Sequence, residues 1–372
     1  MKQKMIFKAV AGLSGLALLL GACSASVTVP PTAPATPSAT NIAVTETSVP
    51  AATSTPSPSE TPNPDPNYWL HRQNPVGWLG WSADSKTLAA SAASGVYLFP
   101  THGNPAAHLL IDEGFLYPSA LDFQGKRLIA GDNVWDITTG QLLYKLSQTD
   151  ISSVAFSPDG SKLALRGDKS ISVLDAASGK VLNSVIVGQE QDQYMQGVAF
   201  SADGKAVYAV FDHKVRQVDL STWKSVVLFS MPDDSCCTVF SPDGQQMLVS
   251  RPGHGAGSKE LWNIEKGGVL QSLGNCDNDT TLEVFSQDGG QFVIGPCGGA
   301  QLWDTRAQKF LHLISNPAMQ GFYPEWRSAA FNPDGSRIAL GNDLGQIMIW
   351  DLSSYELLAT LNLPLPATPL VP

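Results

Sequence analysis

The chain contains few of the residues from which catalytic sites are usually built. Only six of its 372 residues are histidine and five are cysteine, and charged residues make up 15%, compared with about 25% in an ordinary globular protein. No nucleophile-elbow motif (Gly-x-Ser-x-Gly) and no phosphate-binding P-loop occurs. The histidines lack metal-ligand spacing, and the acidic stretch from Asn275 to Thr281 lacks the spacing of a calcium loop. The sequence therefore predicts no cofactor and no metal site, and it favours a non-enzymatic protein.

Basic residues are also scarce. The full chain has a formal net charge of −10 at pH 7. The three lysines of residues 1–22 and the three carboxylates of residues 23–66 offset each other, so the rest of the chain carries the same −10. Affinity for nucleic acid comes largely from lysine and arginine that neutralise phosphate. We therefore expect no nucleic-acid partner, and contact with a membrane only through a lipid anchor.

Residues 1–22 predict a lipoprotein signal peptide. Lysines at positions 2, 4 and 8 precede an apolar stretch (10–20) that is too short to span a membrane as a mature helix. The Leu-Gly-Ala-Cys sequence that ends at Cys23 then resembles the bacterial lipobox, in which the cysteine thiol carries diacylglycerol. The alternative is an ordinary signal peptide followed by a chance cysteine. We expect a chain anchored to a cell membrane through Cys23 that faces the extracytoplasmic side.

Residues 23–66 predict a disordered tether. From Ser24 to Pro66 the chain has ten prolines, nine threonines and seven serines, and it cannot bury enough apolar surface to fold. At about 3 Å per residue its extended reach is on the order of 100 Å. Residues 363–372 predict a short disordered tail.

Residues 67–362 repeat one pattern of turns and short strands seven times. The clearest copy reads Phe156-Ser157-Pro158-Asp159-Gly160, in which proline presets φ and glycine adopts the left-handed conformation. Variants follow Phe200, Phe240, Phe285 and Phe331, and looser ones follow Trp81 and Phe123. A period near forty residues with four strands per unit, and no sustained helical period, is typical of propeller blades. We predict an all-β, seven-bladed β-propeller. Because Phe123-Gln124-Gly125 is two residues shorter than the other copies, we expect a tighter hairpin in the second blade.

Trp-Asp pairs close several of the expected third strands. They are Trp135-Asp136, Trp303-Asp304 and Trp350-Asp351, with degenerate equivalents at Leu174-Asp175, Val218-Asp219 and Trp262-Asn263. Here the chain resembles the WD-repeat β-propeller family. The resemblance implies that the tryptophan wedges between blades, but it implies little about chemistry, because this fold hosts many functions. The family's Gly-His pair before the first strand is absent, so we expect its Asp–His–Ser/Thr–Trp hydrogen-bond network to be missing.

Four cysteines remain besides Cys23, and an even number in an exported protein favours disulfides. In the blade arrangement Cys276 lies in the loop that leads into the sixth blade, and Cys297 lies between that blade's second and third strands. These loops share one face of a propeller, so we predict a Cys276–Cys297 bridge. Other pairings, including a strained bridge between Cys236 and Cys237, and free buried thiols are the alternatives.

The loops that lead into the first strands predict a recognition surface, because loops on a rigid scaffold carry function and exposed aromatic residues anchor partners. The alternative for each residue is an ordinary solvated loop position, with Trp326 packed against a neighbouring blade. The candidate residues on this face are Tyr117, Tyr194, Asp233, Asp234, His254, Tyr323, Glu325 and Trp326.

These features favour a surface-tethered, non-enzymatic scaffold that binds a protein or a cell-envelope component and has a monomeric head. The rival hypothesis is an extracytoplasmic enzyme that acts on a small molecule or glycan in the central channel. It would require channel-facing His, Asp or Glu side chains within hydrogen-bond reach of one another. A third possibility is a structural surface protein without a specific ligand.

Overall fold

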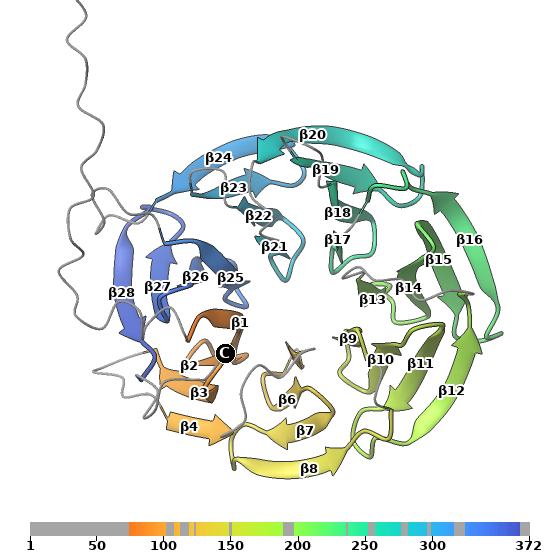
Figure 1. Ribbon diagram of the computed structural model, residues 1–372, viewed down its shortest axis with the longest axis horizontal. Helices are drawn as coiled ribbons and strands as arrows, with labels where there is room; N and C mark the ends of the chain where they lie inside the picture. The colour runs from red at the N-terminus through yellow and green to blue at the C-terminus, as the bar shows by residue number, and fades with distance from the viewer. Residues whose placement is uncertain are drawn as a thin grey trace, which may run out of the picture. The chain divides into compact units, whose positions relative to one another are not determined.

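The structure is a computed structural model that describes residues 74–101, 108–111, 119–122, 124–148, 151–188, 197–235, 237–251, 257–276, 282–295, 299–315 and 324–364. Its strands form seven antiparallel sheets of four consecutive strands each, arranged as blades in a ring (Figure 1). This confirms the predicted all-β, seven-bladed propeller. Within these residues no helix is long and apolar enough to cross a membrane. The predicted signal peptide, the tether and residues 365–372 of the predicted tail lie outside the described residues.

Each blade runs from an innermost to an outermost strand, and we number the blades 1 to 7 in chain order (Figure 1). The innermost strands are β1 (Val76–Trp81), β5 (Ser119–Leu121), β9 (Ser153–Phe156), β13 (Val198–Phe200), β17 (Cys237–Phe240), β21 (Leu282–Phe285) and β25 (Trp326–Phe331). The second strands are β2 (Thr87–Ala92), β6 (Arg127–Ala130), β10 (Lys162–Arg166), β14 (Ala206–Phe211), β18 (Gln246–Arg251), β22 (Gln291–Gly295) and β26 (Arg337–Asn342). The third strands are β3 (Gly95–Pro100), β7 (Asn133–Asp136), β11 (Ser170–Asp175), β15 (Lys214–Asp219), β19 (Gly257–Asn263), β23 (Ala300–Asp304) and β27 (Gln346–Asp351). The outermost strands are β4 (His108–Ile111), β8 (Gln141–Lys145), β12 (Val181–Ile186), β16 (Ser225–Ser230), β20 (Gly268–Cys276), β24 (Lys309–Ile314) and β28 (Leu357–Asn362).

Seven separate apolar clusters hold the blades together, one at each contact between neighbouring blades. Between blades 3 and 4, for example, Val173 of β11 packs in one cluster with Phe200 of β13 and Phe211 of β14. Because no blade can bury both of its faces alone, stability comes from the sum of the contacts between neighbours.

The tryptophans at the next-to-last position of third strands pack against the preceding blade, as the family resemblance implied. Trp350 belongs to the cluster between blades 6 and 7, and Trp262 to the cluster between blades 4 and 5. The Trp262 ring stacks on Phe229 at a centroid distance of 6.0 Å. The indole N–H groups of Trp135 and Trp350 have no hydrogen-bond partner among the described residues. These tryptophans therefore act through packing.

The turn between the first and second strands is locked by a hydroxyl and a carboxylate. In blade 5 the Ser241 hydroxyl donates to Asp243 Oδ1 at 2.6 Å and accepts from the backbone N–H of Gln246 at 2.9 Å. The same pair of bonds recurs in blades 1, 3, 4 and 6. In blade 3 the Ser157 hydroxyl, together with Ser161, lowers the pKa of Asp159 to about 2. The repeated turn is thus built by local hydrogen bonds to an ionised aspartate.

The turn of blade 2 has the same length as the others, and the prediction of a tighter hairpin is wrong. Asp122 takes the serine position, and its Oδ1 accepts from the backbone N–H groups of Lys126 at 2.7 Å and Arg127 at 3.1 Å. The prediction aligned Phe123 with the phenylalanine that precedes the other turns. Leu121 holds that position, because it pairs with the second strand as Phe240 does in blade 5.

The aspartate that closes a third strand caps the turn that follows it. In blade 7, Asp351 Oδ1 accepts from the backbone N–H groups of Ser353 at 2.8 Å and Ser354 at 2.9 Å. The Ser353 hydroxyl also donates to this carboxylate, and the bonds together lower its pKa to about 2. Equivalent bonds to an aspartate occur after β7, β11, β15 and β23, and after β19 the acceptor is the side-chain oxygen of Asn263. The aspartate of the repeat is therefore a turn cap rather than an acid–base group.

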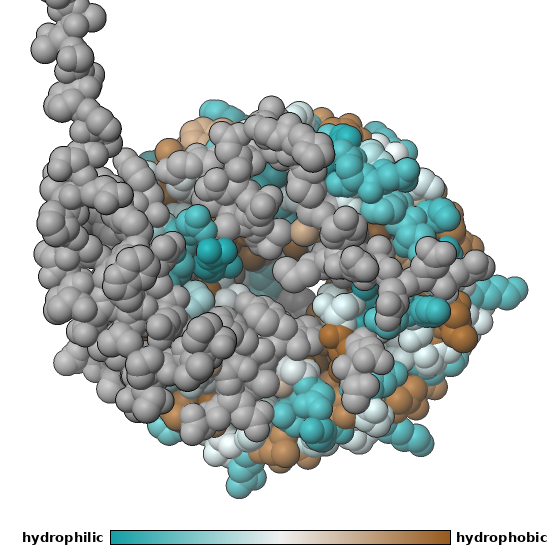
Figure 2. All heavy atoms as spheres, in the orientation of Figure 1, coloured by the Kyte–Doolittle hydropathy of each residue, from teal (hydrophilic) through white to brown (hydrophobic). Residues whose placement is uncertain are grey.

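Each outermost strand contains a bulge against its third strand, and in all seven blades a bulged residue is leucine. In blade 7, Ile349 pairs with Ala359 and Trp350 with Leu357, which leaves Leu358 without a partner. The leucines are Leu110, Leu143, Leu182, Leu228, Leu270, Leu311 and Leu358. The large apolar side chains exposed among the described residues also lie on these outermost strands, at the periphery of the ring (Figure 2). Because a bulge adds twist to an edge, it discourages pairing with a strand of another chain.

The ring closes between blades 7 and 1 without a shared strand. The Ser328 hydroxyl donates to the Val76 carbonyl at 2.8 Å, and Trp81 Nε1 donates to the Ala330 carbonyl at 3.0 Å. An apolar cluster that contains Val76 and Ala330 surrounds these bonds. Closure therefore rests on the same kind of contact as every other blade boundary.

Both ends of the described chain lie at this boundary. Asn74 Nδ2 donates to the Pro364 carbonyl at 3.3 Å, and Asn74 Oδ1 accepts from Ser94 N, in the turn between β2 and β3, at 2.9 Å. We call the face that carries these second-to-third-strand turns and the loops between blades the connecting-loop face. The opposite face carries the first-to-second and third-to-fourth turns, and we call it the hairpin face.

Gln308 provides a test of the turn geometry. It has a φ of +52°, whereas glycines occupy the matching position after β7, β11 and β19. We expect Gln308→Gly to raise the free energy of unfolding by about 1 kcal/mol, because a side chain in the left-handed region costs about that much. Urea denaturation measures the change. The neighbouring control Lys309→Gly, in β24, should instead lower stability by about 0.5 to 1 kcal/mol. A Gln308→Gly protein no more stable than the parent would contradict the expectation.

Candidate interaction surfaces

The innermost strands, which border the centre of the ring, carry almost no charge. Across all seven, only Glu283 of β21 and Arg327 of β25 are charged. Glu283 is 5% exposed, and its carboxylate accepts from Lys259 Nζ at 2.5 Å. The described residues also include no group of three His, Cys, Asp or Glu placed to hold a metal ion. In this part of the chain, the innermost strands do not supply a pair of groups for acid–base catalysis.

The connecting-loop face positions Asp234 through an ion pair. Asp234 lies in the turn before β17, and its two carboxylate oxygens accept from Arg251 Nε and Nη2, both at 2.9 Å. The hydrogen bond from Arg251 is the largest cause of the lowered pKa of Asp234. Asp233 beside it is exposed. Both aspartates are thus exposed on this face, and arginine holds Asp234 in place.

Arg251 extends this contact into the blade. Its Nη1 lies 3.3 Å from Glu260 Oε1, and the other oxygen of Glu260 accepts from Trp262 Nε1 at 2.9 Å. Trp262 is buried between blades 4 and 5. The chain of contacts from Asp234 to Trp262 thus fixes a loop of the connecting-loop face to an inter-blade core.

Two further candidate residues lie at the start of β25, and only one is available to a partner. Glu325 precedes the strand, has a side chain 35% exposed, and pairs with Arg327 at 2.8 Å. Trp326 is 2% exposed and belongs to the cluster between blades 6 and 7. The prediction of Trp326 as a surface contact is therefore wrong. Trp326 is the first residue of an innermost strand, and its side chain packs in a blade boundary.

The remaining candidate positions, apart from Cys276, fall outside the part of the chain that the structure describes. Tyr117, Tyr194, His254, Tyr323, Cys236 and Cys297 lie outside the described residues, as does Cys23, and Cys276 is described only as the last residue of β20. The recognition role of the four loop residues and the Cys276–Cys297 bridge stay predictions.

A buried ion pair joins blades 5 and 6 near the connecting-loop face. Lys259 of β19 contacts the Glu283 carboxylate, and Ser250 of β18 donates to the same carboxylate. Lys259 Nζ also lies 3.0 Å from Ser250 Oγ, a separation compatible with a nucleophile and its base. An ammonium that is paired with a carboxylate cannot accept the serine proton, however. The three side chains therefore fit a structural contact between blades.

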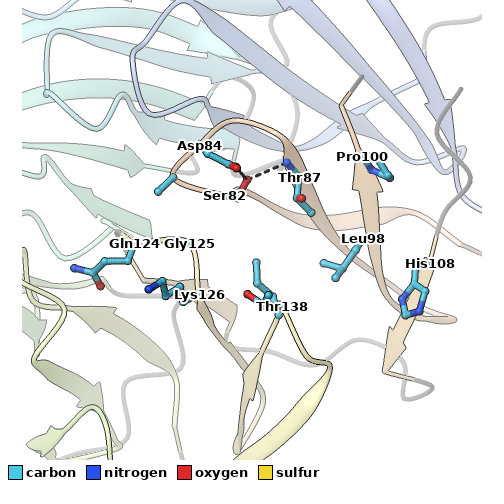
Figure 3. Close-up of a pocket in the computed structure, with 12 residues that line it drawn as sticks. Ser82, Asp84, Thr87, Leu98, Pro100, His108, Gln124, Gly125, Lys126 and Thr138 are labelled. Atoms are coloured by element: carbon cyan, nitrogen blue, oxygen red, sulfur yellow. Dashed lines mark hydrogen bonds between the residues drawn. The ribbon is translucent and has the colours of Figure 1, made fainter. Parts of the chain in front are cut away.

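The hairpin face contains a cleft of about 560 Å³ between blades 1 and 2 (Figure 3). Leu98 and Pro100 of β3 and Ile137 of blade 2 give it an apolar lining. Lys126 and Thr138, from the two turns of blade 2, provide polar groups at its edge. Asp84 also lines the cleft, but its Oδ1 is engaged by the Ser82 hydroxyl and Lys86 N, and the hydrogen bond from Ser82 is the main cause of its lowered pKa.

Sequence reasoning missed the ion pairs and this cleft. Lys259 and Glu283 did carry a local signal, because a charged residue inside a short apolar strand is rarely buried unless it is paired. The pairing itself joins residues 24 positions apart in different blades. The cleft has no local signal, since its walls come from three turns and from strand ends of two blades.

Residues 140–175 match the family described as "WD domain, G-beta repeat". The match contains β8, the outermost strand of blade 2, and the first three strands of blade 3. The head is therefore a β-propeller that contains a WD repeat. The family match covers this one repeat, and the seven blades are given by the structure.

Several curated proteins are similar to this chain. The autophagy-related protein 16 of Arabidopsis thaliana is 24% identical over 235 residues, which cover 62% of this chain and 45% of that protein. An uncharacterised WD repeat-containing protein of Synechocystis sp. is 30% identical over 150 residues, covering 40% and 42%. The guanine nucleotide-binding protein subunit beta of Solanum tuberosum is 28% identical over 246 residues, covering 62% and 53%. The matches span about half, or less, of the length of these relatives.

The Lys259–Glu283 pair predicts a sharp difference between single and double variants. Lys259→Met leaves the Glu283 carboxylate buried without its counter-ion, so we expect the free energy of unfolding to fall by about 3 kcal/mol. Lys259→Met combined with Glu283→Leu removes both charges and should recover most of that loss. Urea denaturation of the two variants and the parent makes the comparison. A single variant within about 1 kcal/mol of the parent would show that the pair is not a buried ionic contact.

Proposed function

We propose that this chain is a surface-tethered, non-enzymatic scaffold that binds a protein or cell-envelope component through its connecting-loop face. The observation that carries the proposal is the chain of contacts from Asp234 through Arg251 and Glu260 to Trp262. It presents the exposed Asp233 on a loop that is tied to an inter-blade core. Such preorganisation reduces the entropy lost when a partner binds. One similar protein is by its name a subunit, which agrees with a propeller acting within an assembly.

The described part of the head begins at Asn74, which lies on the connecting-loop face beside Ser94 and Pro364. A lipid at Cys23 would hold the chain at a membrane despite its net charge of −10. The enzyme hypothesis gains less support. It needs converging acid–base groups in the channel, and the carboxylate of the described innermost strands is already paired with Lys259.

Lipid anchoring can be tested separately from binding. Cells that produce the full chain are labelled with an alkyne analogue of palmitate, and we expect the label to be lost in Cys23→Ser, with the protein released to the medium. Cys297→Ser is the matched control and should keep both the label and the membrane fraction. Label that persists in Cys23→Ser would refute the anchor.

Partner binding can be tested by site-specific photo-crosslinking in cells. A benzoylphenylalanine residue at position 233 or 325 should give one discrete adduct with a protein or envelope component. The same residue at position 203, an exposed turn position of the hairpin face in blade 4, should give none. Arg251→Gln should weaken the adduct at position 233 by about threefold or more, because it removes a charge-assisted contact that holds the loop.

The same experiment can reject the scaffold. Equal adducts at positions 233, 325 and 203 would mean that the face has no specific partner. No adduct at any position, together with turnover of a small molecule or glycan that a substitution in the channel abolishes, would favour the enzyme.

A further inference from the structure

The cleft between blades 1 and 2 has walls that are fixed before any ligand arrives. A Cβ atom at Gly125 would lie 2.3 Å from the backbone nitrogen of Ala83, so the facing turns of the two blades are in direct contact. The buried Asp122 carboxylate also anchors the turn of blade 2, because it accepts hydrogen bonds from the backbone N–H groups of Lys126 and Arg127. Lys126 therefore projects from a rigid backbone. A cleft held in this way loses little entropy when it is filled.

The charges around the cleft leave one cation uncompensated. Asp84 accepts from its own turn and lies 3.7 Å from Lys86 Nζ. Asp136 is occupied by the backbone N–H groups of Thr138 and Thr139. Lys126, in contrast, has no ion-pair partner among the described residues. An unpaired ammonium is thus placed at a cleft in a protein whose net charge is strongly negative.

The other lining groups complement an amphipathic anion. Leu98 and Pro100 form an apolar surface, and Thr138 and His108 add groups that can form hydrogen bonds (Figure 3). Ile137 adds to the apolar lining. The cleft volume, about 560 Å³, lies within the range of small-molecule sites, about 300 to 1,000 Å³. A carboxylate on a short apolar body matches both parts of this lining.

We propose that this cleft binds a small carboxylate with an apolar body, with the carboxylate at Lys126 and Thr138 and the apolar part on Leu98 and Pro100. The ligand is either a free carboxylic acid or the carboxyl end of a peptide with an apolar last residue. The site lies on the hairpin face, so it is separate from the partner surface proposed for the connecting-loop face.

Saturation-transfer NMR on the full-length protein tests the site with pentanoate and 1-pentanol as probes. Pentanoate should bind about tenfold more tightly, because a charge-assisted hydrogen bond is worth about 1.5 kcal/mol or more. Lys126→Met should abolish this preference. Lys205→Met is the matched control, since Lys205 holds the same turn position in blade 4 but does not line the cleft, and it should leave the preference unchanged.

Competition then identifies the source of the carboxylate. The competitors are the peptide Gly-Gly-Val and its C-terminal amide. If Gly-Gly-Val displaces pentanoate and the amide does not, the site binds the carboxyl ends of peptides. If neither peptide competes, the site binds free carboxylic acids. Equal binding of pentanoate and 1-pentanol, a preference that survives in Lys126→Met, or no saturable binding of pentanoate would each overturn the proposal. Because the crosslinking positions lie on the other face, failure here leaves the proposed scaffold function intact.

Discussion

The contact of each blade with its two neighbours is the constraint on which the rest of this molecule depends. In β10, Leu163 and Leu165 pack toward blade 2, whereas Ala164 between them packs toward blade 4. In β18, Met247 and Val249 face blade 4 and Leu248 faces blade 6. Alternation of side chains along a strand thus serves two cores at once, which is why the second strands read as continuous apolar runs. Truncating any one of them would weaken one blade boundary and leave the opposite boundary packed.

A ring built from such contacts must close by the same means. Blades 7 and 1 share no strand, and their boundary combines an apolar cluster with the bonds of Ser328 and Trp81 to backbone carbonyls. The boundary of blades 5 and 6 adds Lys259 and Glu283. Burying two charges is costly, and a well-packed apolar pair is often equally stable. Among the described residues no other blade boundary contains a buried ion pair, so we infer that this pair distinguishes its boundary rather than strengthening it.

The sequence predicts the features of this fold that depend on residues close together in the chain. The Ser-x-Asp-Gly turns and the aspartate caps are local hydrogen-bond patterns, so the seven blades follow from counting them. Blade 2 was misaligned because Asp122 replaces the serine and removes the local signal, although its carboxylate makes the same bonds. The leucine bulges were missed for a different reason. An extra residue in an outermost strand is defined only by its register against the third strand, and no turn residue marks it. Trp326 shows the same limit, since its burial depends on the neighbouring blade.

The two faces of the ring differ in how their charges are arranged, and this difference separates their expected roles. On the hairpin face most carboxylates accept from the backbone of their own turns, as Asp84, Asp159 and Asp351 do, and they stay ionised. Beside the cleft, Lys126 has no ion-pair partner among the described residues. On the connecting-loop face the charged side chains bond to one another across strands, from Asp234 through Arg251 to Glu260. Cross-strand pairs hold a surface in one shape over several residues, which suits recognition of a large partner. Locally capped turns leave a narrow cleft between rigid walls, which suits a small ligand.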